Sequence, residues 1–169
     1  MNFEQGSRLS RLNPKPTVFI LWADKFDECF ATICVTQLRR AGLRVKMVGL
    51  AGRQAKGLNG LMLGTDVALG EVLAMVSDTV CLIIPCDKFA LRRLESDPRL
   101  EDFLRQVSQN EALVVLGHTT AAEAAMIQWQ EIFCSKSVLT PPMDDMMGFA
   151  QNLAQQLLTT ISDRRCGRG

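Results

Sequence analysis

The alternation of short apolar runs with amphipathic stretches is the feature that most limits what this chain can fold into. Apolar runs rich in β-branched residues occur at Thr17–Trp22, Thr79–Ile84 and Leu113–Leu116, and amphipathic stretches separate them. Uninterrupted apolar runs of this length are typical of strands buried on both faces of a parallel sheet. The alternation therefore predicts βαβ units, with helices covering both faces of a mostly parallel sheet.

Weaker signals fill in the remaining elements. A second strand is expected around Val45–Val48, followed by a loop or short hairpin that reaches Asp66, and Ser137–Leu139 is expected to form a short last strand. Helices are expected around residues 30–41, 69–76, 98–107 and 146–161, with another running from the Thr120–Glu123 capping box towards Phe133.

Length and composition favour one domain. The chain has 169 residues, of which 47% are hydrophobic, so a single sizeable core can form. We expect a polar N-terminal arm at residues 1–16, an α/β domain at 17–163 and a basic, loose tail at 164–169. A formal net charge of +1 gives no global field for nucleic acid, and the apolar runs are too short to cross a bilayer.

The cysteines and the single histidine give no metal-binding pattern. The six cysteines include no C-x-x-C pair, and His118 has no cysteine at ligand spacing. We therefore expect reduced thiols in a cytoplasmic protein, with neither a metal site nor a cofactor.

Two segments carry a resemblance to a known family. The run L-R-R-A-G-L-R-V at residues 38–45, followed by V-G-L-A-G at residues 48–52, resembles the DJ-one/PfpI (DJ-1/PfpI) superfamily. The similarity continues through residues 65–69, 80–85, 113–121 and 137–158. This resemblance implies a class I glutamine amidotransferase-like fold, which is a flavodoxin-like three-layer α/β/α sandwich with five or six mostly parallel strands. It also implies a homodimer.

The catalytic elements that the resemblance implies are missing together. Family enzymes carry a nucleophilic cysteine on a sharp strand-to-helix turn, and Gly117 occupies its place here, followed by His118. The family's carboxylate position on the first helix is Phe30, because Glu28 would point elsewhere, and the family's Pro-Gly-Gly turn reads Pro85-Cys86-Asp87. Between the helix after Gly117 and the last strand, the family has a longer segment that carries a further histidine, whereas this chain has only residues 133–136. We therefore expect a pseudoenzyme.

A shallow vestigial pocket is expected at the carboxyl ends of the strands, where α/β folds bind ligands. Its expected frame is Asp24, Phe30, Cys86, Asp87, Gly117, His118 and Thr119. The leading hypothesis is a non-catalytic module for protein interaction, regulation or small-ligand sensing. One alternative is a residual glyoxalase, deglycase or peptidase-type enzyme that uses Cys86 or His118 in a rearranged site. Another is a structural subunit of a larger assembly.

His118 and two cysteines near this edge, Cys29 and Cys86, also have ordinary structural explanations. His118 at a helix start can simply make a local hydrogen bond, and Cys29 and Cys86 can be packing residues rather than partly activated thiols.

Two further segments are candidate partner-binding surfaces. A basic stretch without acidic residues contains Arg39, Arg40, Arg44, Lys46, Arg53 and Lys56. A second segment contains Pro141, Pro142, Met143 and Met146, in which flexible methionines follow a double proline. The basic residues can equally be a solvated face. Because no aromatic residues are interleaved with them, a protein partner is expected rather than nucleic acid.

Overall fold

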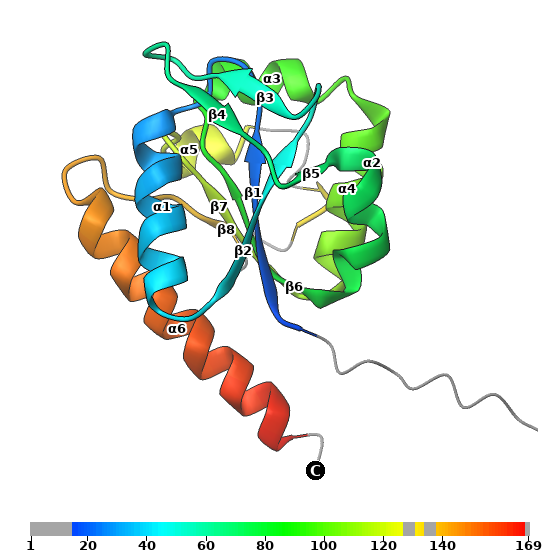
Figure 1. Cartoon of the computed structure of the whole chain (residues 1–169), viewed down its shortest axis with the longest axis vertical. Coiled ribbons are helices and arrows are strands. Elements are labelled where there is room, and N and C mark those ends of the chain that lie inside the picture. The colour runs from blue at the N-terminus through cyan, green and yellow to red at the C-terminus, as the bar shows by residue number, and fades with distance from the viewer. Residues whose placement is uncertain (1–14, 127–130, 134–137, 168–169) are drawn as a thin grey trace, which may run out of the picture.

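The sheet at the centre of the molecule is parallel throughout and has six strands in the order β5-β2-β1-β6-β7-β8. The computed structural model describes residues 15–126, 131–133 and 138–167. The strands are β1 (Thr17–Trp22), β2 (Arg44–Gly49), β5 (Val67–Ala68), β6 (Thr79–Ile84), β7 (Leu113–Leu116) and β8 (Val138–Leu139). A separate antiparallel hairpin, β3 (Gln54–Lys56) with β4 (Met62–Gly64), lies beyond the carboxyl end of β2 (Figure 1).

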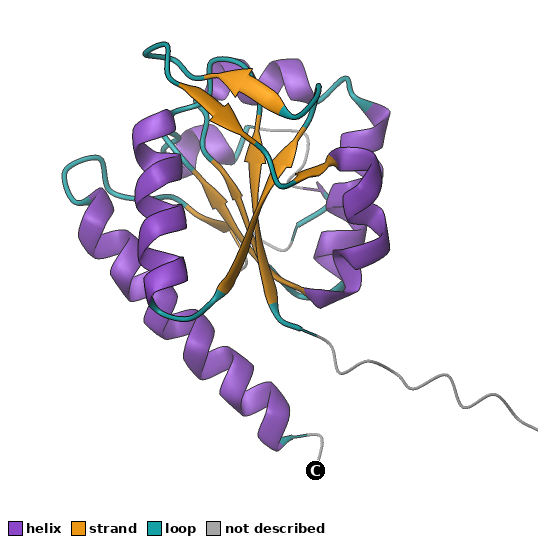
Figure 2. Cartoon of the chain, viewed as in Figure 1, coloured by secondary structure: helices purple, strands orange, loops and turns teal. Residues whose placement is uncertain are grey.

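Helices cover both faces of this sheet (Figure 2). Helices α1 (Glu28–Arg40) and α6 (Met146–Cys166) pack together on one face. Helices α2 (Leu69–Val72), η1 (Leu73–Asp78) and α4 (Pro98–Gln109) cover the other. Two short helices, α3 (Lys88–Leu94) and α5 (Ala121–Ala124), follow the carboxyl ends of β6 and β7. The fold is therefore the predicted flavodoxin-like sandwich.

The core is built on the two central strands. Every residue of β1 and β6 is buried, as expected for strands covered on both faces. On one side, Phe19 of β1 meets Phe103 of α4 edge to face, with ring centroids 6.2 Å apart. Helix α4 begins at Pro98, the start of the range predicted for it, after the N-cap Asp97, and it buries the stripe of Leu100, Phe103, Leu104 and Val107. The apolar runs thus set the positions of β1, β6 and β7 as predicted.

Three helices differ most from the expectations. Helix α3 was not predicted, and the described helix that opens at Thr120 ends at Ala124 instead of continuing towards Phe133. Helix α6 continues to Cys166, and Arg164 Nη2 donates to the backbone carbonyls of Asn110 and Glu111 at 3.3 and 3.2 Å. Residues 164–166 are therefore helical and not a loose tail. Residues 1–14, 127–130, 134–137 and 168–169 lie outside the described residues, and these include the expected strand start at Ser137 and most of the expected N-terminal arm.

Candidate functional site

Three loops meet at the carboxyl edge of the sheet, where the central strands β1, β6 and β7 end side by side. They are residues 23–27 before α1, Pro85–Asp87 before α3, and Gly117–Thr120 before α5. Parallel α/β sheets bind ligands at this edge. The side chains of these loops are therefore the first place to look for chemistry.

Gly117 lies on the turn between β7 and α5, with the ring of Phe30 against it. A Cβ atom built on Gly117 would lie 2.8 Å from Phe30 Cδ1 and 3.0 Å from Pro85 Cα, and both contacts are shorter than real Cβ atoms normally make. Gly117 is not among the described residues with positive φ, so its backbone conformation suits any residue. It is the fully buried Phe30 ring, together with Pro85, that leaves no room for a side chain here.

His118 is the residue that this turn holds in a strained conformation. Its φ is 48°, in the left-handed region that few side chains other than glycine adopt. On sharp strand-to-helix turns of enzymes, the strained position presents the nucleophile. Here it presents an imidazole, one residue after Gly117. Residues 117–120 of this turn contain no thiol.

Asp27, in the loop before α1, faces His118 in the loop before α5. His118 Nε2 is buried and lies against Asp27 Oδ2, and it has no well-oriented hydrogen-bond partner among the described residues. Asp27 is itself buried and is the N-cap of α1, because its Oδ1 accepts from Phe30 N at 2.9 Å. Its own N–H donates to Pro85 O at 2.7 Å. Asp27 therefore links all three loops, through its carboxylate to His118 and through its backbone N–H to Pro85.

Asp27 is not among the site residues predicted from the sequence. An aspartate that follows a strand and stands directly before a helical pattern is an N-cap signal. That signal identifies Asp27 as a helix cap. It does not show that the other carboxylate oxygen, Oδ2, lies against His118.

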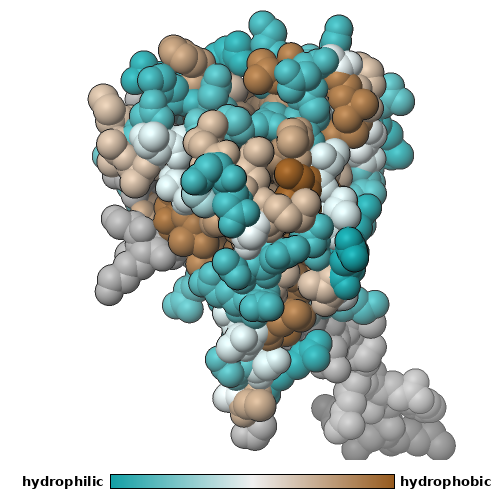
Figure 3. All heavy atoms as spheres, turned by 90° about the vertical axis from the view of Figure 1, so that its left-hand side faces the viewer, coloured by the Kyte–Doolittle hydropathy of each residue, from teal (hydrophilic) through white to brown (hydrophobic). Residues whose placement is uncertain are grey.

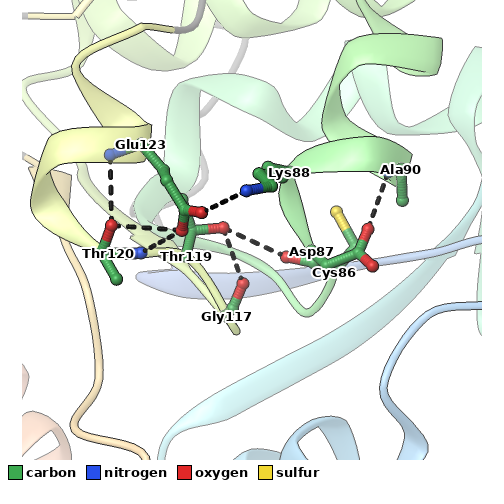
Figure 4. A network of polar contacts seen from close by, with 8 residues as sticks. All are labelled: Cys86, Asp87, Lys88, Ala90, Gly117, Thr119, Thr120 and Glu123. Atoms are coloured by element: carbon green, nitrogen blue, oxygen red, sulfur yellow. Dashed lines mark hydrogen bonds and ion pairs between the residues drawn. The ribbon is translucent and has the colours of Figure 1, made fainter.

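Hydrogen bonds to backbone atoms surround this turn and involve Thr119, Cys86 and Asp87 (Figure 4). The buried Thr119 hydroxyl donates to Gly117 O at 3.0 Å and lies 3.4 Å from Cys86 O. Asp87 is exposed and caps α3 by accepting from Ala90 N at 2.8 Å. The Thr119 contacts hold the ends of β6 and β7 together, and the Asp87 contact fixes the start of α3, so both are structural.

An ion pair joins α3 to α5 beside this turn. Lys88 Nζ lies 2.7 Å from Glu123 Oε1, and Glu123 Oε2 accepts from Thr120 N at 3.0 Å (Figure 4). The hydrogen bond from Lys88, followed by those from Thr120, lowers the pKa of Glu123 to about 2. Glu123 is therefore a carboxylate throughout the physiological range, and it fixes α3 against α5.

The two remaining acidic groups near this edge serve the β3–β4 hairpin. Asp24 is exposed, and its Oδ1 accepts from Lys56 N at 2.9 Å. Glu28 is buried, and its Oε1 accepts from Asn59 N at 2.7 Å. Burial acts to raise the pKa of Glu28, but hydrogen bonds from backbone N–H groups outweigh it and the pKa is lowered. Glu28 points to the hairpin and not to Gly117.

The structure thus brings together five of the seven expected frame residues. Phe30, Cys86, Gly117, His118 and Thr119 gather at the turn, whereas Asp87 opens α3 and Asp24 holds the hairpin. Because four of those five are buried, the turn is filled instead of forming a shallow pocket. A pocket of about 300 Å³ does lie close by, between α3 and α5. None of the seven residues lines it.

The two expected partner surfaces are less uniform in charge and exposure than their sequences indicate. Arg39 pairs with Asp66 at 3.1 Å and Arg53 lies 3.7 Å from Glu71, so the basic stretch has acidic neighbours in space. In the second segment, which contains two prolines and two methionines at residues 141–146, Pro141 is buried and Met146 packs against the core, whereas Met143 is 63% exposed. The face that bears α1 and α6 mixes hydrophilic and apolar residues (Figure 3). Neither surface forms a continuous patch of one kind.

The buried cysteines are expected to be unreactive in the folded protein. Burial raises the pKa of Cys34 to about 12, and burial followed by the nearby Asp87 raises the pKa of Cys86 well above its ordinary value. Iodoacetamide at pH 8 should therefore alkylate the exposed Cys29 and Cys166 and spare Cys86 until urea unfolds the chain. Peptide mass mapping measures this. Alkylation of Cys86 as fast as Cys29 in the native protein would show an accessible thiol.

Two general features of the described residues bear on function. Among them, no three His, Cys, Asp or Glu side chains are grouped to hold a metal ion. Within the same residues, no helix combines the length and apolar character needed to span a membrane.

Comparison with known proteins places this geometry in a family. Residues 16–155 match the DJ-1/PfpI family. No curated protein sequence matched the chain. Among solved structures, Drosophila melanogaster DJ-1beta aligns with a TM-score of 0.68 and 17% identity, covering 85% of this chain and 90% of that one.

Two further structures agree. A cysteine-to-alanine mutant of a DJ-1 superfamily protein from Salmonella typhimurium aligns with a TM-score of 0.70 and 17% identity, covering 85% of this chain and 91% of that one. Schizosaccharomyces pombe DJ-1 aligns with a TM-score of 0.64 and 12% identity, covering 83% and 90% of the two chains. These similarities show the fold, and the family match covers well over half of the sequence. The protein therefore belongs to the DJ-1/PfpI family.

Proposed function

We propose that this protein is a non-catalytic member of its family that uses the scaffold as a binding or regulatory module. The observation that carries the proposal is the packing of the Phe30 ring against Gly117, at 2.8 Å from where a Cβ would stand. A glycine offers no nucleophile, and the ring fills the space that a reacting group would need. A covalent mechanism requires a side chain that is both activated and accessible.

The neighbouring candidates do not replace the missing group. Cys86 is 1% exposed, and burial raises its pKa, which disfavours the thiolate that would attack. The Thr119 hydroxyl is buried and donates to backbone carbonyl oxygens. Both side chains therefore support a structural interpretation of the turn.

A residual enzyme is the second candidate, and one observation favours it. An imidazole oriented by a buried carboxylate is the arrangement of a general base, and His118 with Asp27 has this form. Such an enzyme would activate water or remove a proton from substrate, because Cys86 and Thr119 beside the imidazole are buried. His118 is 29% exposed, so a small substrate could approach the imidazole.

An assay with methylglyoxal separates the two candidates. Consumption of the aldehyde by the purified protein should equal that by the Cys86→Ala/His118→Ala double variant, which controls for non-enzymatic reaction with arginine and lysine. The residual-enzyme candidate instead predicts turnover that is lost in His118→Ala and retained in Cys86→Ala. Multiple turnovers by the unmodified chain would overturn the non-catalytic proposal.

We also propose that the chain forms a homodimer in the cytoplasm and acts through a protein partner. Family resemblance supports the homodimer, and the unpaired cysteines of the described residues suit a reducing compartment. Multi-angle light scattering distinguishes these states: twice the mass of the chain supports a homodimer. A monomer at every concentration tested would overturn it, and a heteromeric complex isolated from native lysate would favour the structural-subunit alternative.

A further inference from the structure

The pocket between α3 and α5 combines two cations, one carboxylate and two exposed apolar side chains. Its volume is about 300 Å³, and it is lined by Lys88, Phe89, Arg92, Glu123 and Met126. We propose that this pocket binds a small carboxylate that carries a flat apolar group. The inference deepens the proposed binding role by naming a ligand class.

The charges of the lining favour an anion. Among the described lining residues, the two cations Lys88 and Arg92 outnumber the one carboxylate, Glu123, which gives a net charge of +1. Lys88 is already engaged, because its Nζ pairs with Glu123 at 2.7 Å and lies 5.3 Å from the centroid of the Phe89 ring. Arg92 makes no ion pair or side-chain hydrogen bond with any residue that the structure describes. Its guanidinium is therefore the group that a ligand carboxylate can bind in bidentate fashion.

The position of Arg92 supports this role. Lys88 and Arg92 are four residues apart on α3, so both cations lie on one face of the helix and repel each other. Glu123 offsets the charge of Lys88 only. A bound anion would offset the second charge.

The apolar part of the lining suits a flat hydrophobic group. Phe89 is 64% exposed and Met126 is 73% exposed, and they approach the pocket from α3 and from the residues after α5. An aromatic face and a polarizable thioether can both pack against a flat ring. A carboxylate attached to such a ring would satisfy Arg92 and cover both apolar side chains at once.

Benzoate is a suitable probe, and its neutral isostere benzamide is the control. Titration of the full ¹⁵N-labelled chain with benzoate should shift the backbone amide signals of residues 88–92 and 123–126, with a dissociation constant in the millimolar range that a nine-atom ligand allows. Benzamide should bind about fivefold more weakly, because it lacks the charge that Arg92 recognises. Equal affinity for the two probes, or shifts confined to other regions, would overturn the proposal.

Two variants with opposite expected signs sharpen the test. Arg92→Gln should weaken benzoate binding about fivefold, the loss expected for one charge-assisted contact at an exposed site. Arg93→Gln is the matched control and should change nothing, because Arg93 is a neighbouring cation on α3 that does not line the pocket. Glu123→Gln should tighten binding, because glutamine can retain the capping box with Thr120 while removing the carboxylate.

Equal effects of Arg92→Gln and Arg93→Gln would show non-specific charge attraction and would contradict the site. A failure of benzoate binding can be distinguished from a failure of the proposed function. The pocket shares no lining residue with the Gly117 turn, so benzoate binding and methylglyoxal turnover can succeed or fail independently.

Discussion

Replacing Phe30 with alanine is expected to lower the free energy of unfolding by about 3–5 kcal/mol, the usual cost of truncating a buried aromatic side chain. Phe30 is fully buried and lies against Gly117 and near the ring of Phe149, whose centroid is 6.3 Å away. Its removal leaves a cavity at the centre of the three loops, which the buried strands cannot close. Urea unfolding followed by circular dichroism measures the loss.

Phe89 provides a matched control for this truncation. It is the same residue type, but it is 64% exposed on α3, so Phe89→Ala should change the free energy of unfolding by no more than about 0.5 kcal/mol. If Phe30→Ala destabilised the chain no more than Phe89→Ala, the ring could not be packed as described. If Phe30→Ala fails to fold, Phe30→Leu serves instead, with an expected loss of about 1 kcal/mol.

Asp27→Ala is the second change with a large expected effect. Loss of the N-cap of α1 costs about 1 kcal/mol, and leaving His118 Nε2 buried without its carboxylate contact adds about 1–3 kcal/mol. Asp27→Asn should cost less, because asparagine caps helices about as well as aspartate. We therefore expect the free energy of unfolding to be highest for the wild type, lower for Asp27→Asn and lowest for Asp27→Ala.

A second N-cap separates the two contributions. Asp145 caps α6 by accepting from Gly148 N at 2.8 Å, is exposed and faces no histidine in the described contacts. Asp145→Ala should therefore cost only the capping term of about 1 kcal/mol. Equal losses for Asp27→Ala and Asp145→Ala would show that the pairing with His118 contributes nothing to stability.

Much of the fold could be predicted from sequence because its strands are unusually clear. The central strands are uninterrupted apolar runs, and their observed bounds equal the predicted ones. Helix α3 could not be found in the same way. It has seven residues and buries only Ala90 and Leu91, which is too short for a helical period to stand out.

The candidate site was only partly predictable for a related reason. Resemblance identified Gly117 and Phe30 as unusual residues, but nothing in their sequence positions showed that the ring of one fills the space beside the other. Asp27 and His118 meet because β1 and β7 flank β6 and end at the same edge of the sheet. Such a contact depends on strand order, which local patterns do not specify.

The same limit explains the misplaced pocket. The expected frame followed the family's catalytic positions, whereas the pocket observed is bounded by α3, which was not predicted, and by the residues around α5. Lys88 and Glu123 carried no sequence signal of their pairing. The sequence thus indicated the correct edge of the sheet but not the side chains that form a cavity there.

The packing of Phe30 against Gly117 is most directly tested by measuring the unfolding free energy of Gly117→Ala in two backgrounds. An alanine at this backbone conformation would by itself stabilise the chain by about 0.4–1 kcal/mol, so a net loss reports the steric clash. We predict a net loss of about 1–2 kcal/mol in the wild type, and a loss smaller by about 1 kcal/mol in Phe30→Leu. Equal effects in both backgrounds, or stabilisation of the wild type, would show that the Phe30 ring does not occupy this space.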